Sequence, residues 1–144
     1  MDVEEEVRRL ADIEAIKVLR SRYSRAVDTK DWALFGASLA EDARLDSEGG
    51  LHEGREAIVA AVSGALATAI TVHHQHTPEI EITGPDSATG IWAMADIVHI
   101  SDFVLRGFGH YVEEYARTAD GWKIKSSTLR RLHIETEGAP PDAR

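Results

Sequence analysis

The sequence predicts an α+β fold, with helices in the first half of the chain and a curled antiparallel sheet in the second. Near the N-terminus, apolar residues recur at three- and four-residue steps, as on the buried face of an amphipathic helix. From Thr71 onward, long segments rich in Val, Ile, Thr and aromatic residues are separated by turn sequences, which is typical of β-strands. With 144 residues, the chain fits one domain around one core.

The first helix is expected over residues 4–27. Its buried face would carry Val7, Leu10, Ile13, Ile16, Leu19, Tyr23 and Val27. A second helix would begin at Asp31, because a carboxylate there can accept the free amide donors of the first turn. Its buried side would carry Trp32, Phe35 and Leu39.

A short strand is expected over residues 43–46, before a turn at Gly49 and Gly50. Helical spacing then resumes over residues 54–69, so that three helices precede the sheet.

Four long antiparallel strands complete the prediction. They cover residues 71–82, 87–99, 103–118 and 122–134. A sheet of this length would wrap around the first helix and leave a cavity between them. We therefore expect one domain over residues 1–136, followed by a flexible tail over residues 137–144.

Composition excludes several classes of function. The net charge of −9 would repel nucleic acid and anionic lipid, so neither nucleic acid nor a membrane is an expected partner. The chain has no cysteine, which excludes disulfides and cysteine nucleophiles. The acidic N-terminus shows no secretory signal, and no apolar segment is long enough to span a bilayer. We expect a cytoplasmic protein.

Two polar residues near the end of the first helix could face the cavity. Tyr23 and Asp28 are five residues apart, about one and a half helical turns. Asp28 could simply cap the turn that follows the helix, and Tyr23 could be a core aromatic residue. The functional alternative is that Asp28 orients a histidine.

Three of the seven histidines lie together in Val72-His73-His74-Gln75-His76. In an extended strand, His73 faces one side of the sheet, while His74 and His76 face the other. A neutral imidazole can take a proton near neutral pH, and a carboxylate on its second nitrogen fixes the tautomer. Asp28 could supply that carboxylate.

A metal site is the weaker interpretation of the histidine cluster. His74 and His76, with Glu79 or Glu81, superficially resemble the first metal-binding motif of cupins. The second cupin motif is missing, and a three-helix opening does not suit a jelly roll. We expect no metal and no cofactor.

Two further residues on the later strands could reach the cavity. Asp96 interrupts an apolar strand, so it either faces solvent or lies in the pocket with a role in proton transfer. His110 could share the cavity or lie on the surface. His52, His99 and His133 belong to no recognisable constellation.

The segment from Tyr23 to Trp32, with Asp28 within it, resembles a helix end in SnoaL-like proteins of the nuclear transport factor 2-like superfamily. Thr71-Val-His73, the following Pro-Glu-Ile-Glu-Ile and the segment from Gly109 to Ile124 also resemble this family. The resemblance covers roughly residues 5–135. It implies a cone-shaped α+β barrel that encloses a pocket, and it favours His73 over His74 as the base.

The resemblance also implies roles for individual residues. Its dehydratase members match at Tyr23, Asp28, His73 and Asp96, which we expect to be catalytic. Substrate contacts are expected from His110, Trp92 and Trp32. The implied activity is that of a cofactor-independent lyase, a dehydratase acting on a hydrophobic hydroxylated steroid, polyketide or aromatic metabolite. An isomerase, a polyketide cyclase or a non-catalytic binding subunit are the alternatives.

Assembly is expected as well. The sheet face turned away from the pocket would carry Trp92 and Met94 or their alternates, which are too apolar to leave exposed as one patch. A homotrimer is the first expectation and a dimer the second.

Overall fold

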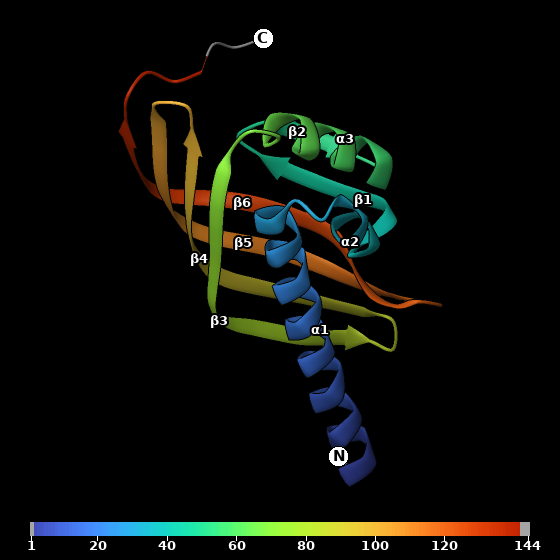
Figure 1. Cartoon of the computed structure of the whole chain (residues 1–144). Coiled ribbons are helices and arrows are strands. Elements are labelled where there is room, and N and C mark those ends of the chain that lie inside the picture. The colour runs from blue at the N-terminus through green and yellow to red at the C-terminus, as the bar shows by residue number, and fades with distance from the viewer. Residues whose placement is uncertain (1, 142–144) are drawn as a thin grey trace.

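A computed structural model describes residues 2–141 and contains three helices and six strands (Figure 1). The helices are α1 (Val3–Thr29), α2 (Trp32–Ala37) and α3 (Arg55–Ala65). The strands are β1 (Leu39–Ser47), β2 (Gly50–Glu53), β3 (Ile70–Gly84), β4 (Ser87–Ile100), β5 (Phe103–Thr118) and β6 (Gly121–Glu137). The predicted α+β organisation is confirmed. Residues 142–144 of the expected tail lie outside the described residues.

The six strands form one curved sheet in the order β2-β1-β6-β5-β4-β3. β3 to β6 make the expected antiparallel meander. The short strand expected over residues 43–46 lies within β1, which runs parallel to β6, so the complete sheet is mixed. The backbone of Ser38 explains this pairing: its carbonyl accepts a hydrogen bond from Ile124 at 2.9 Å and thereby starts β1 alongside β6.

The sheet does not close into a complete barrel. Within residues 2–141, β2 and β3 remain the two edges and do not pair with each other. Helices cover the inner face of the sheet, with α1 packed against β3 and α3 against β1 and β2 (Figure 1). The cone is therefore built from a curved mixed sheet with helices lying over its open side.

Helix α1 is longer than the sheet that it covers. Its C-terminal half buries Ile16, Leu19, Tyr23 and Val27, as predicted. Its N-terminal half projects beyond the sheet (Figure 1), which leaves Val7 and Leu10 more than half exposed and corrects the prediction for these two positions.

No helix in the described part of the chain is long and apolar enough to cross a membrane.

The ends of α1 and α2 are fixed by local capping. Lys30 adopts a left-handed conformation with φ 57°, and the Asp31 amide donates to the Ala26 carbonyl at 2.8 Å, which ends α1. The side chain of Asp31 then accepts from the Leu34 amide at 3.1 Å, as predicted for a helix cap. Leu39 belongs to β1 and not to the second helix.

Strand alternation separates an inner face from an outer face. Ala88, Trp92 and Met94 of β4 are buried on the inner face. Of the two alternatives for the far face, the structure selects the alternates of Trp92 and Met94, since Ile91 and Ile97 are the exposed residues. The parity of this strand could not be read from its composition, because both sets of positions are apolar.

A buried ion pair lies on this inner face. Arg20 of α1 and Glu113 of β5 are both fully buried, with Arg20 Nε 3.0 Å from Glu113 Oε1. Glu113 also accepts from the Tyr115 hydroxyl at 2.8 Å and from Ser127 at 2.6 Å. The Arg20 guanidinium lies between two tyrosine rings, with its carbon 4.3 Å from the Tyr23 centroid and 4.0 Å from the Tyr111 centroid. Charge and aromatic contacts thus fix α1 against the sheet.

We expect Glu113→Leu to lower the free energy of unfolding by about 3–5 kcal/mol, because it leaves the Arg20 charge buried and unpaired. The double variant Arg20→Met/Glu113→Leu should be more stable than this single variant. Urea denaturation measures both, with the exposed neighbour Glu114→Gln as a control expected within about 0.5 kcal/mol of the parent. A Glu113→Leu variant as stable as the parent would contradict a structural role for the pair.

Candidate active site

A cavity of about 430 Å³ lies between the helices and the inner face of the sheet. Its wall comes from α1, the turn between β1 and β2, α3 and strands β1 to β6. Most of the lining is apolar, including Val27, Leu45, Val62, Leu66, Val98 and Leu129. Polar and titratable side chains interrupt this surface in one region, and His73 lies among them.

His73 and Asp28 form the predicted pair. His73 Nδ1 lies 2.7 Å from Asp28 Oδ1. The backbone amide of His73 donates to Asp28 Oδ2 at 2.9 Å, and the Thr71 hydroxyl donates to Oδ1 at 2.9 Å. One carboxylate at the end of α1 therefore binds the ring and the backbone of β3 together.

Strand parity selects which histidine enters the cavity. Thr71, His73 and Gln75 point inward, while His74 and His76 are exposed on the outer face, as predicted. A second link supports this register, because the Ser24 hydroxyl donates to Gln75 Oε1 at 2.6 Å. Two side-chain links thus hold β3 against α1.

The hydrogen bond to Asp28 determines which ring nitrogen can act as a base. A carboxylate only accepts hydrogen bonds, so Nδ1 of a neutral His73 carries the proton and Nε2 has a free lone pair. Burial alone would raise the pKa of Asp28, but the hydrogen bonds from the His73 ring and backbone lower it overall. Asp28 therefore stays ionised at neutral pH. Such a pair can abstract a proton and stabilise the resulting imidazolium.

A second charged pair borders His73. Both oxygens of Asp96 accept from Arg131, at 2.6 Å from Nη1 and 2.9 Å from Nη2. Asp96 Oδ2 lies 4.0 Å from His73 Nε2, which is too far for a hydrogen bond. Arg131 Nε also donates to Glu48 in the turn between β1 and β2. Burial opposes the charge of Arg131, but the hydrogen bonds to Asp96 and Glu48 raise its pKa overall.

Gly107 provides the space for this pair. It lies opposite Asp96 in the register of β4 and β5. A Cβ at Gly107 would collide with Arg131 Nη1 and with Asp96 Oδ1. The absence of a side chain there lets the guanidinium lie across β5 and reach the carboxylate.

Two tyrosines, Tyr23 and Tyr111, line the cavity. Burial raises the pKa of Tyr23 to about 12, and burial also raises the pKa of Tyr111. Both phenols therefore keep their proton at neutral pH and can donate a hydrogen bond. Tyr23 was predicted at this site, whereas Tyr111 was not.

The structure does not bring all of the predicted residues to the cavity. His110 alternates with the inward-facing Tyr111 and points to the outer face of the sheet. Trp92 is buried and does not line the cavity, and its indole N–H donates to the Tyr115 hydroxyl at 2.8 Å. Trp32 packs edge-on against Phe35 in the core, with ring centroids 5.9 Å apart. The expected placement of these three side chains against a substrate is therefore corrected.

Other lining residues were not found by sequence reasoning. Arg131, Tyr111, Ser127 and His52 all line the cavity. Arg131 reaches Asp96 only through the sheet register, in which Asp96 pairs with Gly107, and Gly107 pairs with Ile134 near Arg131. His52 lies in the local β1–β2 hairpin, which reaches the cavity through the pairing of β1 with β6. A sequence without the sheet register contains no signal for these contacts.

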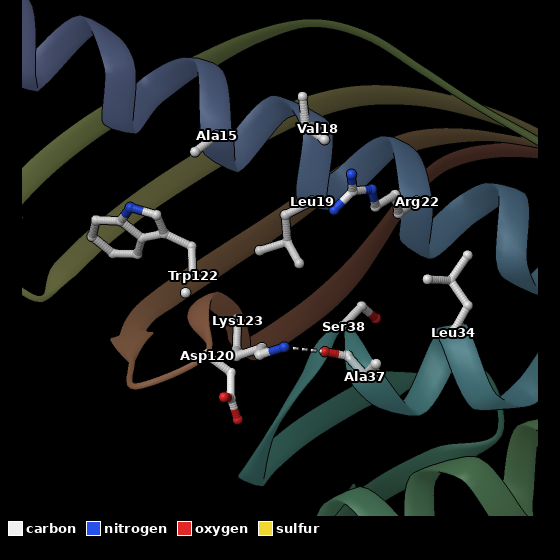
Figure 2. Close-up of a pocket in the computed structure, with 11 residues that line it drawn as sticks. Ala15, Val18, Leu19, Arg22, Leu34, Ala37, Ser38, Asp120, Trp122 and Lys123 are labelled. Atoms are coloured by element: carbon white, nitrogen blue, oxygen red, sulfur yellow. Dashed lines mark hydrogen bonds between the residues drawn. The ribbon is translucent and has the colours of Figure 1, made fainter.

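A second cavity, of about 360 Å³, lies between α1, α2 and the turn before β6 (Figure 2). It shares no lining residue with the first. Lys123 Nζ donates to the Ala37 carbonyl at its edge, and no histidine lines it. Within residues 2–141, no three His, Cys, Asp or Glu side chains are arranged to hold a metal ion. The His73 cavity is the candidate active site, because it contains a histidine paired with a carboxylate.

Comparison with known proteins gives the family. Residues 8–128 match the model of the SnoaL-like domain. The terrestric acid biosynthesis cluster protein E of Penicillium crustosum is 34% identical over 131 residues, which cover 84% of this chain and 83% of that protein.

Solved structures share the fold. A scytalone dehydratase-like protein from Novosphingobium aromaticivorans superposes with a TM-score of 0.82 at 19% identity, covering 91% of both chains. A hexachlorocyclohexane dehydrochlorinase, LinA-type3 from Novosphingobium barchaimii, superposes with a TM-score of 0.81 at 21% identity, covering 94% of this chain and 99% of that one. At these identities the structures establish the fold alone. The family match over most of the chain shows that this protein belongs to the SnoaL-like domain family.

Proposed function

We propose that this protein is a cofactor-independent lyase of the dehydratase type, acting on a hydrophobic hydroxylated small molecule. The observation that carries the proposal is the His73–Asp28 pair, at 2.7 Å, in the wall of a largely apolar cavity. A steroid, a polyketide or an aromatic metabolite is the class of substrate that such a cavity suits.

In the proposed reaction, His73 Nε2 removes a proton from the carbon next to a carbonyl. Asp28 keeps the ring in the required tautomer and stabilises its positive charge. The Tyr23 hydroxyl donates a hydrogen bond to the enolate oxygen as negative charge develops there. Asp96 lies 4.0 Å from His73 Nε2 and adds a further negative charge beside the imidazolium.

The comparisons support this class of reaction. One neighbour in fold is named for a dehydratase and another for a dehydrochlorinase, so both names describe the loss of a small molecule from a substrate. The relative from Penicillium crustosum is named for a biosynthesis cluster, which fits a small-molecule substrate. An isomerase or a cyclase would use the same proton abstraction, and a binding subunit would use only the cavity.

We also propose that copies of this chain associate through the outer face of the sheet, as a trimer or, as second choice, a dimer. This face exposes Val72, Ile91, Ile97 and Phe108. Arg106 and Arg130 also lie on this face, where Glu79 lies opposite Ile91 and Glu135 lies opposite Arg106. A second copy packed on the four apolar side chains would remove them from water.

His73→Ala should lower the rate of proton abstraction by about 10²–10⁴-fold, because the oriented imidazole is lost. Two probes measure it: deuterium exchange next to the carbonyl of a bicyclic aromatic ketone, and naphthol formation from the corresponding β-hydroxy ketone. His74→Ala, on the outer face, is the control and should match the parent. Equal exchange rates in a folded His73→Ala protein would contradict the assignment.

Light scattering should give three times, or else twice, the chain mass of 15.8 kDa. Ile97→Glu combined with Phe108→Glu should give the mass of one chain, because buried carboxylates without partners oppose association. Val7→Glu, on the projecting part of α1, is the matched control and should leave the mass unchanged. A parent protein with the mass of one chain would refute assembly through this face.

A further inference from the structure

The proposed elimination requires a proton donor in addition to the base His73. When the hydroxyl group departs, its oxygen must receive a proton to leave as water. The titratable side chains that line the cavity are Tyr23, Glu48, His52, His73, Asp96, Tyr111 and Arg131. His73 is already committed as the base.

The carboxylates and the arginine are committed to one another. Both oxygens of Asp96 and one oxygen of Glu48 accept hydrogen bonds from Arg131. A proton on Asp96 would have to displace one of the two bonds from the guanidinium. The pKa of Arg131 is raised, so it does not release a proton at neutral pH. None of the three is suited to protonate a departing hydroxyl.

The two tyrosines are poorly matched to this step. Burial raises the pKa of Tyr23 to about 12 and also raises that of Tyr111. General acid catalysis is most efficient when the pKa of the acid lies near the working pH. The phenols can donate hydrogen bonds, but they are weak proton donors.

The remaining group is His52, on the edge strand β2. It pairs with Leu45 across β1 and β2, and directly opposite residues share a face, so its ring points inward with Leu45. His52 Nε2 lies 3.9 Å from the position of a Cβ on Gly49, which also lines the cavity. Among residues 2–141, neither ring nitrogen has a hydrogen bond or an ion pair. The ring is half-buried.

We infer that His52 is a catalytic acid of the proposed reaction, which protonates the departing hydroxyl group. This inference rests on the proposed function. β2 and β3 are the opposite edges of the sheet, and both contribute to the wall of the same cavity, so a substrate that fills the cavity can contact His52 and His73 together. One histidine can therefore act on the C–H bond while the other acts on the C–O bond.

The step balances without a further reactant. His73 Nε2 takes the proton of the C–H bond, and the electron pair of that bond forms the enolate. The enolate electrons then form the carbon–carbon double bond as the C–O bond breaks. The departing oxygen keeps the C–O electron pair and takes a proton from the His52 imidazolium, which leaves water and a neutral His52. His73 returns its proton to solvent, and His52 regains one.

The test separates the two protons with two probes. The bicyclic aromatic ketone without a hydroxyl group reports proton abstraction by deuterium exchange, and the corresponding β-hydroxy ketone reports loss of water by naphthol formation. In His52→Gln, exchange should continue at the parental rate while naphthol formation falls by about 10²-fold or more. His76→Gln, on the outer face, is the matched control.

Naphthol formation at the parental rate in His52→Gln would overturn the acid role of His52. A parent protein that exchanges deuterium without forming naphthol would overturn it too, while leaving proton abstraction by His73 intact. A parent protein that does neither would overturn the proposed function itself. A His52→Gln variant that lost exchange as well would show a structural role and would also overturn the inference.

Discussion

The Asp28 carboxylate is the interaction on which the site depends. It is the last inward-facing polar group of α1, and it receives the Thr71 hydroxyl, the His73 amide and the His73 ring at 2.7–2.9 Å. β3 is an edge strand with only β4 beside it in the sheet. No second strand lies beside β3 to accept the backbone N–H of His73. The Asp28 carboxylate of α1 accepts it instead. The same contact that holds this edge of the cone also orients the His73 ring.

Charge around the His73 ring is distributed asymmetrically. Asp28 binds one side of the imidazole, and the Asp96–Arg131 pair lies on the other side. The bidentate bond uses the donors of Arg131 that would otherwise face the cavity, so its positive charge is largely balanced within the wall. Gly107 makes this arrangement possible, because any side chain there would displace the guanidinium. Nε2 of His73 therefore lies beside a charge-balanced pair, in a cavity whose remaining lining is mostly apolar.

Local patterns in the sequence were sufficient for much of the fold and for half of the site. Helical spacing predicted α1, and strand alternation predicted that His73 and His74 face opposite ways. The parallel pairing of β1 with β6 joins strands that are far apart in the sequence, and no local pattern encodes it. That pairing also brings the local β1–β2 hairpin, and His52 with it, to the cavity. Arg131 illustrates the difficulty, since a β-bulge in β6 next to it resets the alternation. Trp92 shows the same limit, because its strand is apolar on both faces.

The proposed role of His73 as a base requires Asp28 to hold the neutral ring with its Nε2 lone pair free. Proton–nitrogen correlation NMR of the imidazole nitrogens measures this directly, at a pH where the ring is neutral. In the parent protein the ring proton of His73 should reside on Nδ1, and Asp28→Ala should allow it to move to Nε2. A parent protein whose neutral His73 carries its proton on Nε2 would lack the free lone pair and would refute proton abstraction by His73.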